Sequence, residues 1–173
     1  MNRFAEWLST TFLSVFIQNH NSWAVPTVQS IHILGIGTVV GSLLMIGLRI
    51  LGIAGTDQTL VQTERRFGPC LTGSLWLLLA TGIFLVIGEP VRELVTFSFW
   101  LKMALVAAGT LIAAVFRSSL RRNEQHWELT LARRGVVRLL TIFTLLLWAG
   151  IIVLGRLIAY DHVWGVWSPA TKA

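Results

Sequence analysis

The sequence is poor in cysteine and in charged residues. Its 173 residues include one cysteine, Cys70, and only 13% of them are charged. A single cysteine excludes an intramolecular disulfide scaffold and a metal framework of repeated Cys-x-x-Cys pairs. The low charge, with 54% hydrophobic residues and a mean hydropathy of +0.70, excludes an ordinary water-soluble domain and a disordered chain. The composition indicates an integral membrane protein.

The sequence also lacks the motifs of common soluble enzymes. It contains no G-x-S-x-G nucleophile motif, phosphate-binding loop, H-E-x-x-H zinc motif or dinucleotide fingerprint. Gly35 and Gly37 lie inside an apolar run, whereas the glycines of a dinucleotide fingerprint follow a strand. We therefore expect no hydrolase or transferase activity. An enzymatic role, if there is one, would be that of a membrane oxidoreductase component.

Four apolar stretches are long enough to cross a bilayer as helices. Windows of about 19 residues place them near residues 27–51, 70–88, 97–116 and 136–160. Inside lipid the backbone must satisfy its own hydrogen bonds, and these stretches are too long for barrel strands. We predict an all-α integral membrane fold, a four-transmembrane-helix bundle that forms a single domain over residues 1–173.

The residues before the first stretch form an amphipathic pattern. Large apolar residues recur at three- and four-residue spacing, from Phe4 and Trp7 to Phe12 and Phe16, whereas Glu6 is off this stripe. This pattern predicts a helix over residues 3–18 that lies in the membrane interface. Polar residues interrupt the stretch and no A-x-A site follows, so we do not expect a cleaved signal peptide.

The cations are distributed unevenly between the two sides of the predicted bundle. By the positive-inside rule, the loops after the first and third spans are cytoplasmic and both termini are periplasmic, in a bacterial inner membrane. This topology explains the net charge of +6, so we expect lipid rather than nucleic acid as the partner. The cytoplasmic group contains Arg49, Arg65, Arg66, Arg117, Arg121, Arg122, Arg133, Arg134 and Arg138, and the other group contains Arg3, Arg92, Lys102, Arg156 and Lys172.

The first span contains a small-residue motif, Gly37-x-x-x-Gly41. Small residues let membrane helices approach closely, because apolar side chains gain little by leaving lipid for each other. We expect a tight contact at this motif, either within the bundle or with another subunit. A homodimer or a larger membrane complex is the corresponding oligomeric prediction.

Three of the four histidines lie toward the predicted periplasmic side. His20 precedes the first span, His32 lies about two turns inside it, and His162 follows the fourth span. Because these two spans run antiparallel, His32 and His162 could face each other at similar depth. Two opposed imidazoles suit a six-coordinate haem iron, and three suit copper or zinc. The alternative is structural, with each ring hydrogen-bonded to a neighbouring helix or placed at the interface.

Two cations occupy the same half of the predicted bundle. Lys102 lies inside the third span and Arg156 inside the fourth, where an unpaired charge is costly. They could pair with Glu89, Glu93 or Asp161, or extend to the interface. They could also bind an anion, and haem propionates or quinone oxygens fit such donors.

The segment from Trp23 to Gly41, with His32 near its middle, and its continuation through Leu48-Arg49-Ile50-Leu51-Gly52 resemble a known type of first span. Small bacterial four-helix membrane proteins without assigned activity have such a span. The segment is also similar to that of copper-resistance D-type and b-type cytochrome-like membrane proteins, whose first helix carries a histidine followed by small residues. The resemblance implies a metal or haem site at His32. The chain departs from the b-type cytochrome pattern because it lacks several buried histidine pairs.

These observations lead to three functional hypotheses. The first is a b-type haem protein of electron transfer with haem near the outer side, His32 and His162 as axial ligands, and Lys102 and Arg156 facing the propionates. Its partner would be a quinone or a redox protein. The second is periplasmic-side copper binding or transport through His20, His32 and His162. The third is a non-catalytic accessory subunit of a larger membrane complex.

Overall fold

The computed structural model describes residues 2–20, 22–122 and 135–159, and these residues form helices and connections with no strand. Its long helices are α3 (Ala24–Leu51), α4 (Leu60–Gly88), α6 (Phe97–Arg122) and α8 (Gly135–Ala159). All four are long and apolar enough to cross a membrane. The prediction of an all-α chain with four such helices is confirmed.

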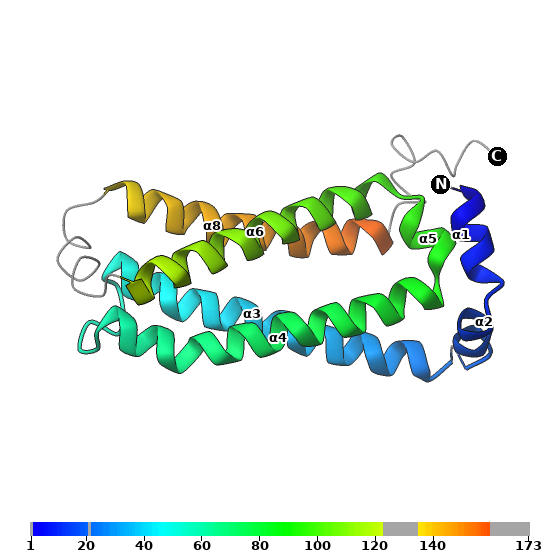
Figure 1. Ribbon diagram of the computed structural model, residues 1–173, viewed down its shortest axis with the longest axis horizontal. Coiled ribbons are helices and arrows are strands. Elements are labelled where there is room, and N and C mark those ends of the chain that lie inside the picture. Colours follow the sequence, from blue (N-terminus) through cyan, green and yellow to red (C-terminus); the bar gives the residue numbers. More distant parts are fainter. Residues whose placement is uncertain (1, 21, 123–134, 160–173) are drawn as a thin grey trace.

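The four long helices run alternately up and down and form one elongated bundle (Figure 1). The short helices α1 (Asn2–Ser9), α2 (Phe12–Asn19) and α5 (Pro90–Leu94) lie together at one end, which we call the capped end. The other end, which we call the arginine-rich end, carries the α3–α4 connection. It also carries Arg65, Arg66, Arg121, Arg122 and Arg138, so these cations share one end as expected.

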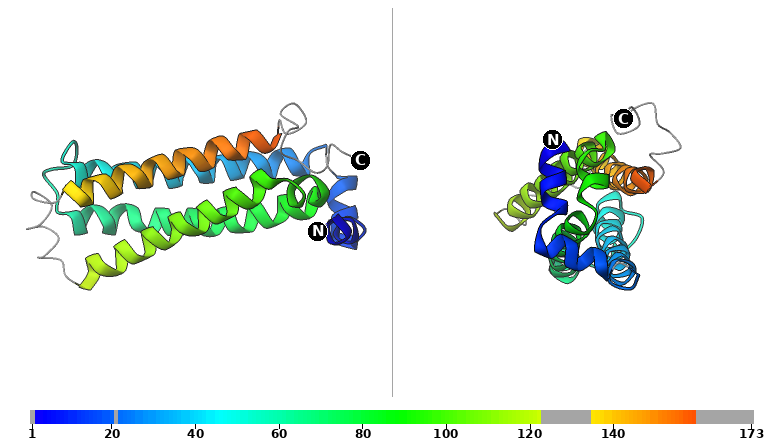
Figure 2. Two further views of the ribbon diagram at one scale, coloured as in Figure 1. Left: turned by 90° about the horizontal axis from the view of Figure 1, so that it is seen from above. Right: turned by 90° about the vertical axis from the view of Figure 1, so that its right-hand side faces the viewer.

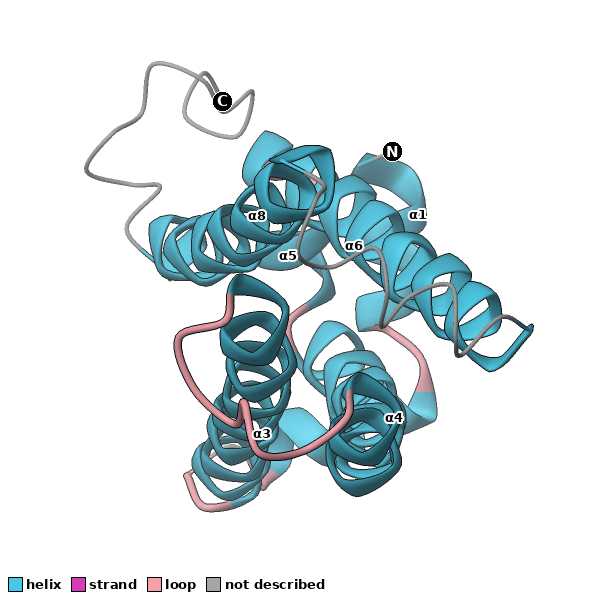
Figure 3. Cartoon of the chain, turned by 90° about the vertical axis from the view of Figure 1, so that its left-hand side faces the viewer, coloured by secondary structure: helices cyan, strands magenta, loops and turns pink. Residues whose placement is uncertain are grey.

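Seen from the arginine-rich end, α3 lies between α4 and α8, and α6 lies beside α8 (Figure 3). The closest helix pairs are α3 with α4 and α6 with α8, and α3 with α8 joins these two hairpins. Helix α6 is inclined to the other helices (Figure 2) and packs less closely against α4 than against α8.

Helix α4 begins earlier than the sequence pattern predicted. We expected a connection as far as Pro69 and a span from Cys70, but the helix begins at Leu60 and contains Pro69. The reason is a capping box. The Thr59 hydroxyl accepts a hydrogen bond from the Gln62 backbone N–H at 3.1 Å, and the Gln62 side chain accepts one from the Thr59 N–H at 2.9 Å. The connection to α3 is therefore only residues 52–59.

The prediction of one continuous helix over residues 3–18 is wrong, because the structure has two helices, α1 and α2. The interfacial position of this segment stays a prediction. The hydroxyls of Thr10 and Thr11 donate to backbone carbonyls three residues back, and such bonds compete with helix continuation. The amphipathic pattern nevertheless holds. Ala5, Ser14 and Ile17 are buried, and Ser14 Oγ donates to the Ile87 carbonyl at 2.7 Å. The opposite face exposes large rings, namely those of Phe4, Trp7, Phe12 and Phe16.

The centre of the bundle is packed around one tryptophan. Trp148 of α8 is buried together with Val39 of α3, Leu71 of α4 and Ile151. A second apolar cluster, nearer the arginine-rich end, contains Ile46, Ile50, Leu60 and Leu120. Together these clusters join all four long helices.

The glycines that make close contacts are not those of the predicted motif. A Cβ at Gly35 would lie 3.0 Å from a methyl of Leu78, and one at Gly109 would lie 3.1 Å from Trp148 Nε1. Gly47 is similarly close to α8. A Cβ at Gly37 or Gly41, in contrast, would meet no atom within 4 Å. The motif Gly37-x-x-x-Gly41 therefore makes no tight contact among the described residues.

The contrast between these glycines gives a stability prediction. The change Gly109→Val should destabilise the fold by about 1–3 kcal/mol, because the added methyls overlap Leu147 and Trp148. Gly37→Val, the matched control, adds the same side chain to an open face. Thermal unfolding in detergent, followed by helical circular dichroism, measures both. Equal losses for the two variants would contradict this packing.

Candidate histidine and lysine site

His32 of α3 is hydrogen-bonded to Thr81 of α4. Its Nδ1 lies 2.7 Å from Thr81 Oγ1, and the His32 ring is half-buried whereas Thr81 is buried. His32 lies about 12 Å along α3 from Ala24, and Thr81 about 10 Å along α4 from Gly88. Both residues thus belong to the capped half of the bundle.

The hydrogen bonds around Thr81 assign the protonation of the His32 ring. Thr81 Oγ1 donates its one hydrogen to the Leu77 carbonyl at 2.7 Å. With that hydrogen on the Leu77 carbonyl, the same oxygen accepts from His32, and in this arrangement Nδ1 carries the ring hydrogen. In the neutral ring, Nε2 is left with a free lone pair, which is the form that ligates metals. A second partner that fixes the tautomer in this way is typical of metal-ligating histidines.

Two glycines bring α3 and α4 close enough for this bond. Gly35, one turn after His32, packs against Leu78, and a Cβ there would be in tight contact. Gly82 lies under the ring, where a Cβ would be 3.7 Å from His32 Cε1. A Cβ at Gly35 would thus require Leu78 to move, whereas one at Gly82 would be in ordinary contact with the ring.

Lys102 of α6 is the second predicted site residue that the structure brings here. Its side chain is half-buried, and it lies about 8 Å along α6 from Phe97, so it belongs to the same capped half of the bundle as His32. The Lys102 Nζ lies 3.8 Å from the Cβ position of Gly155 on α8. No ion pair joins Lys102 to another residue within the part of the chain that the structure describes. His32 and Thr81 thus join α3 to α4, and Lys102 lies at the contact of α6 with α8 in the same half of the bundle.

The other predicted site residues are placed differently or lie outside the description. His20, at the end of α2, donates from Nδ1 to the Phe16 carbonyl at 2.9 Å, and its ring contacts Phe16 with centroids 4.6 Å apart. Arg156 is exposed on α8. Asp161 and His162 lie outside the described residues. Over residues 2–20, 22–122 and 135–159, no three His, Cys, Asp or Glu side chains gather to hold a metal.

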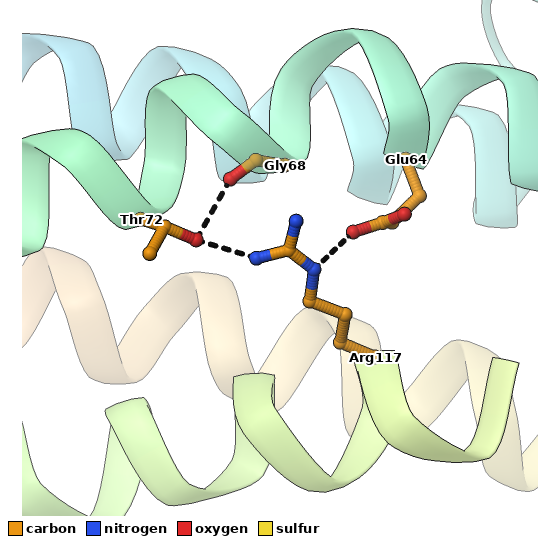
Figure 4. Close-up of polar contacts among 4 residues, drawn as sticks. All are labelled: Glu64, Gly68, Thr72 and Arg117. Carbon is orange, nitrogen blue, oxygen red and sulfur yellow. Dashed lines mark hydrogen bonds and ion pairs between the residues drawn. The ribbon is translucent and has the colours of Figure 1, made fainter. Parts of the chain in front are cut away.

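A second polar cluster joins α4 and α6 near the arginine-rich end (Figure 4). Arg117 Nε forms an ion pair with Glu64, and Arg117 Nη1 donates to Thr72 Oγ1. The Thr72 hydroxyl donates in turn to the Gly68 carbonyl at 3.0 Å. Sequence reasoning treated Arg117 only as a topology determinant. It missed this pairing because Glu64 was placed in a connection rather than in a helix.

The sequence also gave no direct signal for Thr81. A threonine in a transmembrane helix usually bonds its own backbone, and Thr81 does so through Leu77. Only the tertiary structure shows that its oxygen also accepts from His32. The available clue was weaker: an ionisable ring inside a span requires a polar partner on a neighbouring helix.

The fold defines the class of protein first: an all-α bundle with four helices apolar enough to cross a membrane. Within that class, the chain belongs to DUF6644, a family of unknown function, whose model matches residues 4–161. Comparisons with curated proteins and with solved structures find no match. The family match contains His32, Thr81 and Lys102. The resemblance to copper-resistance D-type and b-type cytochrome-like proteins stays a prediction.

The Thr81 bond can be tested without any ligand. In the Thr81→Val variant the Nδ1 hydrogen of His32 loses its acceptor, so the ring should redistribute between its two neutral tautomers. Nitrogen-15 NMR of histidine-labelled protein reads this as a shift of both ring nitrogens. Thr81→Ser keeps the hydroxyl and should preserve the parent spectrum. A Thr81→Val spectrum identical to the parent would disprove the assigned bond.

Proposed function

We propose that this protein is a multi-pass membrane protein that binds one b-type haem and serves in electron transfer. The observation that carries the proposal is the 2.7 Å contact between His32 Nδ1 and Thr81 Oγ1, which leaves Nε2 as the ring nitrogen that can face a ligand. An ionisable side chain inside an apolar helix is a functional candidate by default. Haem, when bound, would supply one-electron chemistry that no protein side chain here provides.

Each residue of the site has a distinct role in this proposal. His32 Nε2 would hold the iron, and Thr81 would be a positioning residue that holds the ring from its other nitrogen. Lys102 donates to a propionate, and exposed Arg156 is available to the second propionate or to a quinone. His162 as the second axial ligand is carried over from the sequence prediction.

The ligand count favours haem over copper. A haem iron takes four nitrogens from the porphyrin and needs only one or two from the protein. A copper or zinc site closed by protein takes three or four side chains. The described residues bring His32 to this place, whereas His20 is bonded to the Phe16 carbonyl. Copper binding by His20, His32 and His162 is the alternative outcome of the test below.

The proposed membrane placement follows from the two ends of the bundle. The arginine-rich end faces the cytoplasm under the positive-inside rule, so the capped end and the haem face the periplasm of an inner membrane. The exposed rings on α1 and α2 support this placement, because such rings favour the membrane interface. Electrons would then pass to or from a partner at the periplasmic side.

Absorption spectroscopy of protein purified in detergent from cells that make haem tests the proposal. We expect a Soret band in the parent and its loss in His32→Ala, because the iron loses its ligand. His20→Ala, the matched control, should keep the band, since that ring is already bonded to the Phe16 carbonyl.

The other outcomes separate the alternatives. Stoichiometric copper without a Soret band would support the copper hypothesis instead of the haem hypothesis. Absence of any metal would support the accessory-subunit hypothesis. A Soret band that persists in the His32→Ala variant would show that another residue is the iron ligand. In the His162→Ala variant, haem should stay bound through His32 and lose its six-coordinate low-spin spectrum.

The two cations give a prediction about the reduction potential. Lys102→Gln should lower the midpoint potential of the haem, because removal of a positive charge favours the more positively charged oxidised state. Arg156→Gln removes the same charge from an exposed position, where solvent screens it, so its shift should be smaller. Redox titration followed at the Soret band measures both. A larger shift of the midpoint potential in Arg156→Gln than in Lys102→Gln would indicate that the propionates lie away from Lys102.

A further inference from the structure

Helix α4 contains a glycine and a proline in succession, Gly68 and Pro69, within its helical range. Proline has no backbone N–H, so the helix lacks the hydrogen bond that residue 69 would donate four residues back. Its ring also crowds the preceding turn, and glycine adds backbone freedom on the same side. This pair is therefore the place where α4 can bend most easily.

Arg117 of α6 contacts α4 on both sides of this pair (Figure 4). Its Nε pairs with Glu64, about one turn before Gly68 and Pro69, and its Nη1 donates to Thr72, about one turn after Gly68. Thr72 also donates to the Gly68 carbonyl at 3.0 Å. One planar guanidinium thus spans the weak point of the helix, which a lysine with a single nitrogen could not do.

The absence of a side chain at residue 68 makes room for this arrangement. A Cβ there would collide with the Glu64 carboxylate and lie 3.0 Å from Arg117 Nη2. The Glu64 side chain is only 5% exposed, so its charge depends on Arg117 for compensation. Gly68 therefore makes the helix more flexible and also leaves room for the Glu64 and Arg117 pair.

The part of α4 before the pair is tied mainly to other helices. Leu60, which is fully buried, packs with Ile46 and Ile50 of α3 and Leu120 of α6. Beyond the pair, Leu71 belongs to the central cluster around Trp148. The two parts of α4 thus have separate apolar anchors, and Arg117 bonds to both parts.

We propose that Gly68 and Pro69 form a hinge in α4 and that Arg117 is the latch that holds it. With both Arg117 bonds made, residues 60–68 are held in line with the rest of α4. With the bonds broken, this segment changes its angle and carries the 52–59 connection with it. The hinge is independent of haem binding, because it lies at the opposite end of α4 from Thr81.

Pulsed electron paramagnetic resonance on the full-length protein tests the latch. Spin labels are attached through Arg66→Cys, before the hinge on α4, and Leu140→Cys on α8, both exposed positions, in a Cys70→Ser background. We expect one narrow distance distribution in this parent. In Arg117→Gln we expect a broader distribution with a second population, because residues 60–68 can then change their angle to the rest of α4.

Two further variants separate a latch from a simple interhelical bond. Pro69→Ala restores the missing hydrogen bond, so the Arg117→Gln, Pro69→Ala double variant should return to the narrow distribution. Arg121→Gln, the matched control, removes an exposed arginine one turn further along α6 and should change nothing. If Arg117→Gln does not fold, Thr72→Val removes the Arg117 bond beyond the hinge together with the Thr72 bond to the Gly68 carbonyl, keeps the Glu64 ion pair, and should broaden the distribution less.

Two results would overturn the proposal. The first is a distribution that stays narrow when the Arg117 bonds are removed by Arg117→Gln or, failing that, when one is removed by Thr72→Val. The second is a distribution that is equally broad in Arg117→Gln and in the Arg117→Gln, Pro69→Ala double variant. This would mean that α4 moves as a rigid helix and has no hinge.

Discussion

The close approach of α3 and α4 is the contact on which the candidate site depends. Gly35 fits against Leu78 and Gly82 lies under the His32 ring, so the imidazole reaches the Thr81 hydroxyl. Between apolar helices a polar group without a partner is costly, and this bond satisfies the histidine while leaving one ring nitrogen for a ligand. A larger side chain at Gly35 would force α3 and α4 apart and separate the pair.

The two polar clusters, one at His32 and one at Arg117, satisfy buried polar groups between apolar helices in different ways. Near the capped end, His32 and Lys102 lie in the same half of the bundle, and no carboxylate pairs with Lys102 among the described residues. The lysine cation favours an anionic ligand group. Near the arginine-rich end, Glu64 and Arg117 compensate each other across α4 and α6. That cluster holds helices and has no need of a ligand.

Sequence reasoning was accurate where the signal was apolar length and failed where side-chain hydrogen bonds decided the backbone. Hydropathy located the four long helices, but the loop expected before Cys70 proved to be helical because Thr59 and Gln62 cap α4. The first segment was amphipathic as expected, yet Thr10 and Thr11 divide it into α1 and α2. His32 and Lys102 were both predicted and share a region, whereas Thr81 was not predicted at all.

The sequence by itself determined the class of fold, because hydrophobic runs of bilayer length leave the backbone no alternative to helices. It also determined that the arginines group at one end, since their position along alternating helices sets their side. Only the tertiary structure decided which glycines make contact, which hydroxyl holds His32 and which carboxylate pairs with Arg117. Those choices depend on the rotation of each helix about its axis, and packing against neighbouring helices fixes that rotation.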